Sequence, residues 1–265
     1  MKLILPFHQD GYKYNHRRGW VNKGIQQIFS SVPVTYEIIN HILTLGFDTP
    51  VRRYAAKLAA SGNTQRITQC GKRTTQNARL ILDVCTGTGE MAQCLSKYIG
   101  RNTLIIASDF TLPMLRYARQ RQTSQVRFTA ADSIRLPFRD NTFDLVTISF
   151  ATRNINVSRQ NLLGCLKEFR RVLKPGGRFI NLETSQPSSL LLRRMLHIFV
   201  KTFVKPIGSI ISGSTQAYAY LSQTIPRFYD ADRFSEIILE AGFQKCKYKH
   251  LMGGLAAIHE GTKKQ

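Results

Sequence analysis

A short stretch ahead of the middle of the chain carries residue types suited to holding a nucleotide. The apolar run 80–84 contains one acid, Asp83, and passes into Gly87-Thr88-Gly89, after which a helical pattern begins at Glu90. Glycine at 87 and 89 allows backbone dihedrals that other residues avoid, and it leaves main-chain N–H groups open to a ligand. The N–H groups at the start of the next helix face the same space. This stretch predicts a site for a ligand with a nucleotide-like handle.

Acidic residues follow the next two apolar runs at positions that suit the same ligand. Asp109 ends the run 104–108, about twenty residues after Gly89, where a doubly wound sheet presents a carboxylate to the two ribose hydroxyls. The alternative is that Asp109 only caps the helix that follows. Asp132 and Ser133 follow the third apolar run, where an acid and an adjoining amide can read adenine; a turn-forming aspartate is the alternative there.

The elements that must position these residues alternate regularly. Strands are predicted near 79–84, 103–108, 125–129, 144–150 and 177–183, and helices near 89–98, 111–121 and 158–173. Such connections give an α/β fold, a doubly wound and mostly parallel sheet of Rossmann type with helices on both faces. A helix over 232–241 and an antiparallel hairpin over 243–251 and 255–260 complete the sheet.

Two segments extend this core. Residues 1–78 form a helical cap and linker, with helices predicted over 21–30, 35–45 and 49–60 and a polar linker over 61–77, ahead of the main domain 79–265. Residues 184–230 form an inserted lid or membrane-contact segment. Within them Leu192, Met195, Leu196, Phe199 and Phe203 recur at helical spacing, while Arg194, Lys201 and Lys205 form another stripe. This helix either lies in the headgroup layer of an anionic bilayer or packs on the cap as a lid.

Composition bounds the partners and the compartment. The 265 residues include 38 Lys and Arg against 16 Asp and Glu, and the net charge of +22 favours an anionic partner, nucleic acid or acidic lipid, unless the proteome is simply basic. The 5 cysteines are scattered, so neither a disulfide framework nor a metal site is expected. No apolar run approaches the length of a membrane span. We expect a cytoplasmic protein that contacts the inner face of the membrane peripherally. The composition leaves open whether the protein forms a homodimer.

Several motifs carry a resemblance to a known family. They are 83–90, 136–144, 147–154, 173–178, the Tyr220-Leu221 pair and the stretch Phe29–Asn40 that includes Tyr36. The chain resembles the class I methyltransferases and, within them, the quinone C-methyltransferases of menaquinone and ubiquinone synthesis, over about residues 25–262. Glu90, Cys85 and Glu37 stand where the family usually has Asp, Ala and Asp. The resemblance implies a seven-stranded sheet and S-adenosylmethionine as cofactor, with contacts at Thr88, Asp109, Asp132, Ser133 and Ser149.

The resemblance also implies a reaction. The sulfonium methyl group is already activated, so the protein must align it with a ring carbon of a prenylated quinol and exclude water. Arg153, Asn154 and Tyr36 are expected to line the ring, with Arg153 stabilising a developing phenolate. The alternative for Arg153 is an ion pair that holds its loop. The expected reaction is demethylmenaquinol to menaquinol, and the alternative is the benzoquinol of ubiquinone synthesis.

Other functions fit the sequence less well. A nucleic-acid amino-methyltransferase usually has Asn/Asp-Pro-Pro-Tyr/Phe after the fourth strand, and Ser149-Phe150-Ala151-Thr152 stands there instead, so nucleic acid is not the expected substrate. A binding module with an inactive cofactor fold conflicts with the intact turn at Gly87 and Gly89. Methylation of another small lipophile stays open.

Overall fold

The computed structural model describes residues 41, 44, 46–61, 79–121, 123–204, 206, 219 and 222–265. The helices predicted over 21–30 and 35–45 and the linker predicted over 61–77 lie wholly or mostly outside these residues. The third predicted helix of the N-terminal segment is present as α3 (Asp48–Ser61). Pro50 falls in its first turn, where a missing N–H costs no helical hydrogen bond.

In the ranges that the structure describes, seven strands form one sheet in the order β3-β2-β1-β4-β5-β7-β6. The strands are β1 (Arg79–Val84), β2 (Thr103–Asp109), β3 (Val126–Ala130), β4 (Phe143–Ser149), β5 (Leu173–Thr184), β6 (Lys245–Leu251) and β7 (Ala256–Thr262). The first five run parallel, and β7 lies antiparallel between β5 and β6. This arrangement confirms the predicted mostly parallel, seven-stranded sheet with a C-terminal hairpin.

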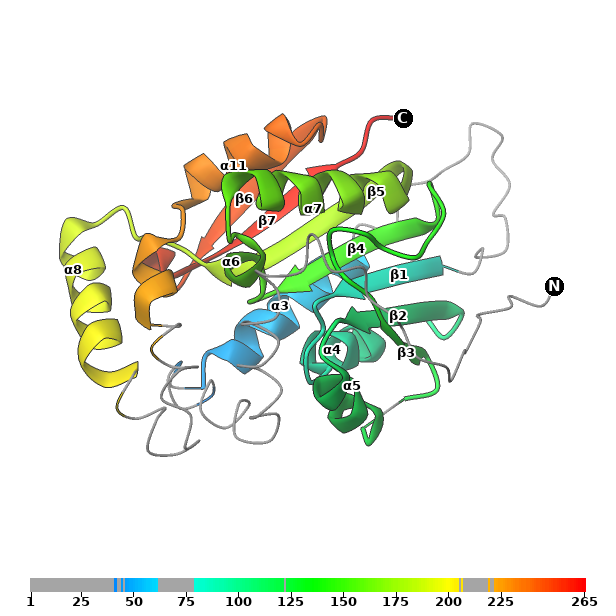
Figure 1. Ribbon diagram of the computed structural model, residues 1–265, viewed down its shortest axis with the longest axis horizontal. Helices are drawn as coiled ribbons and strands as arrows, with labels where there is room; N and C mark the ends of the chain where they lie inside the picture. The colour runs from blue at the N-terminus through cyan, green and yellow to red at the C-terminus, as the bar shows by residue number, and fades with distance from the viewer. Residues whose placement is uncertain are drawn as a thin grey trace, which may run out of the picture.

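Helices cover both faces of the sheet (Figure 1). On one face lie α3, α4 (Glu90–Tyr98) and α5 (Leu112–Arg119), where Ala55, Met91 and Leu95 are fully or almost fully buried. On the other lie α7 (Arg159–Val172) and α11 (Ala231–Glu240). Apolar residues recur along α7 at the spacing of one helical face: Leu162, Cys165, Leu166, Phe169 and Val172. The two apolar layers hold the strands so that all five parallel strands end at one edge.

The strand β5 begins earlier than its sequence pattern predicts. The predicted start at residue 177 follows a Pro-Gly-Gly turn, but pairing with β4 already joins Leu173 to Phe143. The register then shifts before Arg178 pairs with Leu145, and Gly176 takes a φ of 69° inside this irregularity. The Pro-Gly-Gly stretch therefore forms a bulge within the strand, which glycine permits because it has no Cβ.

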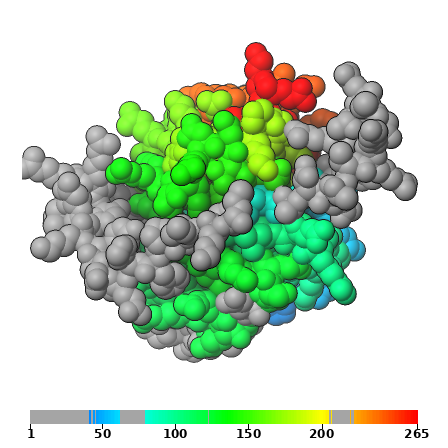
Figure 2. Space-filling model, turned by 90° about the vertical axis from the view of Figure 1, so that its right-hand side faces the viewer, coloured from blue at the N-terminus to red at the C-terminus, as the bar shows by residue number. Residues whose placement is uncertain are grey.

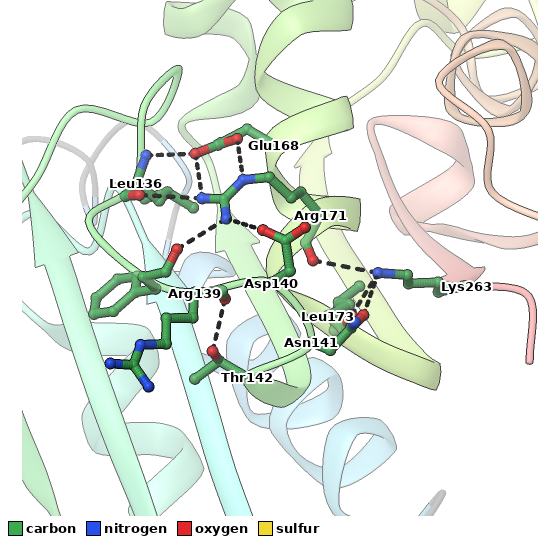
Figure 3. Close-up of polar contacts among 10 residues, drawn as sticks. Leu136, Arg139, Asp140, Asn141, Thr142, Glu168, Arg171, Leu173 and Lys263 are labelled. Carbon is green, nitrogen blue, oxygen red and sulfur yellow. Dashed lines mark hydrogen bonds and ion pairs between the residues drawn. The ribbon is translucent and has the colours of Figure 1, made fainter. Parts of the chain in front are cut away.

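A network around Arg171 ties the loop between β3 and β4 to α7 (Figure 3). The Arg171 guanidinium donates to both Glu168 carboxylate oxygens at 2.8 Å, to Asp140 at 2.6 Å, and to the carbonyls of Phe138 and Leu136 at 2.9 and 3.2 Å. The Glu168 carboxylate also accepts the Leu136 N–H at 2.7 Å. This loop also contains Asp132 and Ser133, the residues predicted to contact the ligand after the third strand. The network therefore holds in place the loop that carries them.

The C-terminal segment closes the opposite end of the molecule from the strand tips. Lys263 donates to Asn141 at 2.8 Å and to the Leu173 carbonyl at 2.7 Å. Figure 2 views the end where β1 begins, and it shows the red C-terminal residues above the green middle of the chain. The starts of β4 and β5 are thereby held together.

A helix beyond β5 projects from the edge where the parallel strands end (Figure 1). It consists of α8 (Leu190–Phe199) and a π-helical turn, Val200–Val204. The exposed apolar side chains are Leu190, Leu191, Leu192, Met195, Ile198 and Phe203, each between 37% and 70% exposed. Leu196 and Phe199 of the predicted stripe are half-buried instead, and Val200 and Val204 are buried. In the described part of the chain no helix has the length and apolarity to cross a membrane.

Candidate functional site

A cavity opens at the carboxyl ends of the parallel strands, between the turn after β1 and the segments after β3 and β4. Eight of the residues singled out in the sequence line it: Asp83, Gly87, Thr88, Asp109, Asp132, Ser133, Ser149 and Asn154. They come from four different loops, and the parallel strands bring those loops to one edge.

The turn after β1 has the strained backbone that the glycines predict. Cys85, Gly87 and Gly89 all have positive φ, at 53°, 56° and 82°. A Cβ at Gly87 would meet no atom of the described residues within 4 Å, so the main chain there faces open space among them. A Cβ at Gly89 would lie 3.2 Å from the Ala118 Cβ, so this glycine serves packing between α4 and α5. The Gly87 and Gly89 N–H groups donate to Asp109 and to the Thr86 carbonyl, at 2.9 Å each, so they are not open to a ligand as the sequence predicted. Gly87 instead leaves the space beside its Cα clear among the described residues, and Gly89 lets the helices approach.

Asp109 holds the turn together from the end of β2. Its two carboxylate oxygens accept the Gly87 N–H at 2.9 Å and the Thr111 N–H at 2.8 Å. The side chain is 6% exposed, and burial raises the pKa of its carboxyl against the opposing effect of those N–H groups. The cap-like contact with Thr111 that the sequence left as an alternative is therefore present. Asp109 also lines the cavity, and its contact with a ribose stays a prediction.

Asp83 connects β1 to β4 beneath the turn. Its carboxylate accepts the Thr86 hydroxyl at 2.5 Å and the Thr147 hydroxyl at 2.7 Å. Burial raises the pKa of this carboxyl to about 6, although the two hydroxyls favour the ionised form. Asp83 therefore ties the turn to β4 and places a carboxylate in the cavity wall.

The loop after β3 contributes Asp132 and Ser133. The Asp132 carboxylate accepts the Ile134 N–H at 3.2 Å, which is the turn-forming contact left open by the sequence. The Ser133 hydroxyl lies 3.6 Å from the Cys165 sulfur and is almost buried. Both residues still line the cavity, so the turn and a ligand contact are compatible.

Within the described part of the chain, two buried polar atoms of the cavity wall have no hydrogen-bond partner. Ser149 Oγ at the end of β4 and Asn154 Oδ1 in α6 (Thr152–Ile155) are buried and find no hydrogen bond among the described residues. A buried polar atom without a partner costs about 1 to 3 kcal/mol, so such atoms point to a ligand that completes them. A nucleoside supplies hydroxyl and amine partners for Ser149, and a hydroxyl of a second ligand beside it suits Asn154 Oδ1, so the site fits a nucleoside with room for a second molecule.

Arg153 forms an ion pair, whereas the adjacent Asn154 lines the cavity. Its Nη1 lies 3.2 Å from both Glu183 Oε1 and the Thr184 hydroxyl, and its backbone N–H donates to Glu183 Oε2 at 3.0 Å. Arg153 does not line the described cavity, and the ion pair that the sequence left as the alternative is observed. Its contact with a substrate ring stays a prediction. Tyr36 lies outside the described residues.

Arg52 and Phe150 are among the cavity-wall residues that sequence reasoning missed. Arg52 of α3 reaches the cavity, and its guanidinium lies 5.0 Å from the centre of the Phe150 ring. Phe150 has a φ of 54°, a strained value for a bulky residue and one that often marks a functional site. The only sequence signal for Arg52 is the acid four residues earlier, Asp48, which is a common surface pattern on helices.

The chain matches a family model and individual relatives along most of its length. A family model described as the ubiE/COQ5 methyltransferase family matches residues 17–263. The chain is 30% identical over 244 residues to the ubiquinone/menaquinone biosynthesis C-methyltransferase of Pseudomonas fluorescens (strain SBW25), covering 90% of this chain and 88% of that protein. The same enzyme of Azotobacter vinelandii is also 30% identical over 244 residues, covering 90% of this chain and 89% of that protein.

Solved structures share the fold at low identity. A SAM-dependent methyltransferase from Thermotoga maritima gives a TM-score of 0.56 at 19% identity, covering 90% of this chain and 99% of that one. Phosphoethanolamine N-methyltransferase 2 of Haemonchus contortus, in complex with S-adenosyl-L-methionine, gives 0.53 at 14% identity, covering 79% of this chain and 52% of that one. These similarities establish the architecture alone.

Proposed function

The chain belongs to the ubiE/COQ5 methyltransferase family, with S-adenosylmethionine as methyl donor, and from that premise we propose that it methylates a ring carbon of demethylmenaquinol to give menaquinol. The observation that carries the proposal is the cavity itself, where Ser149 Oγ and Asn154 Oδ1 have no hydrogen-bond partner among the described residues and lie in the same wall as the glycine turn. The relatives' names cover both quinones, so the benzoquinol of ubiquinone synthesis is the second candidate.

The cavity residues divide between the two ligands. For the cofactor we assign the main chain at Gly87, Thr88 and Gly89, together with Asp83, Asp109, Asp132, Ser133 and Ser149. When bound, the cofactor supplies a methyl group already activated by a sulfonium. The chain then needs only to orient the two ligands and exclude water, since alignment alone accounts for much of the rate enhancement.

The turn α6 is assigned to the quinol. Asn154 faces the cavity, so its side-chain amide is placed against a ring oxygen and orients the ring. Arg153 supports this turn through Glu183, and it stabilises a developing phenolate electrostatically. The Glu183 carboxylate offsets part of that positive charge, which weakens the effect. Tyr36 is assigned to the ring on the family resemblance alone.

A membrane surface is the proposed source of the quinol. The exposed apolar residues of α8 and the turn after it, Leu191, Met195, Ile198 and Phe203 among them, lie beside the exposed cations Arg194 and Lys201. A helix of this kind binds at the headgroup layer of an anionic bilayer, where each cation contributes about 1 kcal/mol. The docking site then lies at the same edge of the sheet as the cavity (Figure 1).

Methyl transfer from radiolabelled S-adenosylmethionine tests the reaction. Chemically reduced demethylmenaquinol and the ubiquinone-type benzoquinol are offered separately in vesicles with anionic lipid, with tRNA as a parallel acceptor. We expect label in demethylmenaquinol, and a large loss with Asn154→Ala at unchanged cofactor binding. Label in the benzoquinol alone would replace the first substrate by the second. Label in tRNA alone would overturn the proposal.

Vesicle binding tests the surface. Met195→Ser with Ile198→Ser removes two exposed apolar side chains, and we expect weaker sedimentation with anionic vesicles. Leu239→Ser is the matched control, because Leu239 is 44% exposed on α11, away from this helix. Equal sedimentation of the two variants would contradict the membrane assignment.

A further inference from the structure

One wall of the cavity contains a buried arginine that none of the assignments above uses. Arg52 of α3 has a side chain 8% exposed. Its Nη1 lies 2.8 Å from Asp48 Oδ2, and its Nη2 lies 2.9 Å from Glu90 Oε2, in the first turn of α4. Arg52 and Glu90 both line the cavity, and Phe150 packs against the guanidinium. The cavity wall therefore presents a cation and an anion side by side.

The strand order places this pair at one end of the cavity. Asp132 and Ser133 follow β3, while Glu90 follows β1 and Phe150 follows β4. Strands β3 and β4 are separated by three strand spacings, which is about 14 Å. Asp109, Asp132, Arg52 and Glu90 line the same cavity, so a nucleoside held at the two aspartates leaves the part of the cavity beside Arg52 and Glu90 for the substituent on its ribose.

The charges there match what that substituent carries. The methionine end of S-adenosylmethionine bears a carboxylate, an ammonium and a sulfonium, and the whole cofactor has a net charge of about +1 near neutral pH. Asp48, Arg52 and Glu90 together carry a net charge of −1. Asp48 and Glu90 take two of the five N–H donors of the Arg52 guanidinium, and its planar fork suits a further carboxylate.

We propose that Arg52 and Glu90 form the subsite for the amino-acid end of the cofactor, with the Arg52 guanidinium binding the carboxylate and the Glu90 carboxylate binding the ammonium. Arg52 also joins α3 to α4, so occupation of the subsite couples the helix that precedes the core to cofactor binding. The inference rests on the proposed position of the adenosine, and it does not depend on which quinol is methylated.

Calorimetric binding of three ligands to the full chain tests the subsite without any methyl acceptor. S-adenosylmethionine carries both amino-acid charges, decarboxylated S-adenosylmethionine lacks the carboxylate, and 5′-methylthioadenosine lacks both. With Arg52→Gln we expect S-adenosylmethionine to bind more weakly by on the order of tenfold to a hundredfold, the effect of one charge-assisted hydrogen bond. Binding of the other two ligands should change little. Glu90→Gln should weaken the first two ligands and spare 5′-methylthioadenosine.

The control is Arg53→Gln, which removes the same charge from the next residue of α3, where the side chain is exposed. It should leave all three affinities unchanged. Equal weakening of all three ligands by Arg52→Gln would show that Arg52 only clamps α3 to α4 and would overturn the proposal, as would no change for any ligand. Failure of 5′-methylthioadenosine to bind the wild-type chain would instead refute the position assigned to the adenosine.

Discussion

Glu183 holds Arg153 by two contacts, one to its side chain and one to its backbone. The Arg153 guanidinium lies 3.2 Å from one carboxylate oxygen, and its backbone N–H donates to the other at 3.0 Å. Both side chains are almost fully buried. The neighbouring Thr152 hydroxyl donates to Asn181, two residues earlier on the same face of β5. The turn α6, which presents Asn154 to the cavity, is thus attached to β5 at two points.

Glu183→Gln should lower the free energy of unfolding by about 3 kcal/mol, because it leaves a buried guanidinium without its counter-charge. Urea unfolding at neutral pH measures the change. The double variant Arg153→Met, Glu183→Leu should recover much of that stability, since neither charge then remains buried. A Glu183→Gln protein as stable as wild type would show that the pair contributes nothing to the fold.

Alanine at the two glycines of the turn should have different effects. At Gly87 the new methyl group enters open space, so we expect a modest loss of stability, about 1 kcal/mol for the left-handed backbone, and a strong loss of cofactor binding. At Gly89 it meets Ala118 and the Phe128 ring at 3.2 and 3.3 Å, and overpacking adds about 1 to 3 kcal/mol. Thermal unfolding and calorimetric binding of both variants test this difference, and equal melting temperatures would refute it.

Arg171→Lys should destabilise the loop between β3 and β4. A lysine ammonium cannot reproduce the fork that bonds Glu168, Asp140 and two carbonyls, so we expect a loss of about 2 kcal/mol. Hydrogen exchange should speed up at the Leu136 amide, which Glu168 accepts. Arg139→Lys, an exposed position on the same loop, is the control and should leave that amide protected. Unchanged exchange in Arg171→Lys would rule out the proposed clamp.

His259 should make the fold sensitive to mild acid. Burial lowers the pKa of its imidazole to about 4, from an ordinary value of 6.5. Between these values the unfolded chain binds a proton that the folded chain does not, so stability is lost as the pH falls through that range. The loss is about 2 kcal/mol at pH 5. Unfolding free energies of the wild type and His259→Gln are measured at pH 7.5 and pH 5. The difference between the two pH values should be smaller in His259→Gln, by about 2 kcal/mol. An identical pH dependence would exclude His259 as its source.

The sequence alone determined the sheet and the position of its ligand edge. Alternating apolar runs and amphipathic helices are local patterns, and parallel strands joined by right-handed crossovers leave few other arrangements. The acids after β2 and β3 and the glycine turn after β1 had to meet at one edge, because the carboxyl ends of parallel strands coincide. Asp109 and Asp132 could therefore be predicted together from their places at strand ends, while the contact at Ser149 was predicted from the family resemblance.

Only the tertiary structure decided which side chains face the cavity. Arg153 and Asn154 are adjacent in the sequence, yet Asn154 lines the cavity and Arg153 turns to Glu183, some thirty residues away. Arg52 enters the site from α3 and meets Glu90 there, although neither residue has a local pattern that predicts the other. These pairings depend on how helices pack across the sheet, and packing joins residues that no short sequence motif contains together.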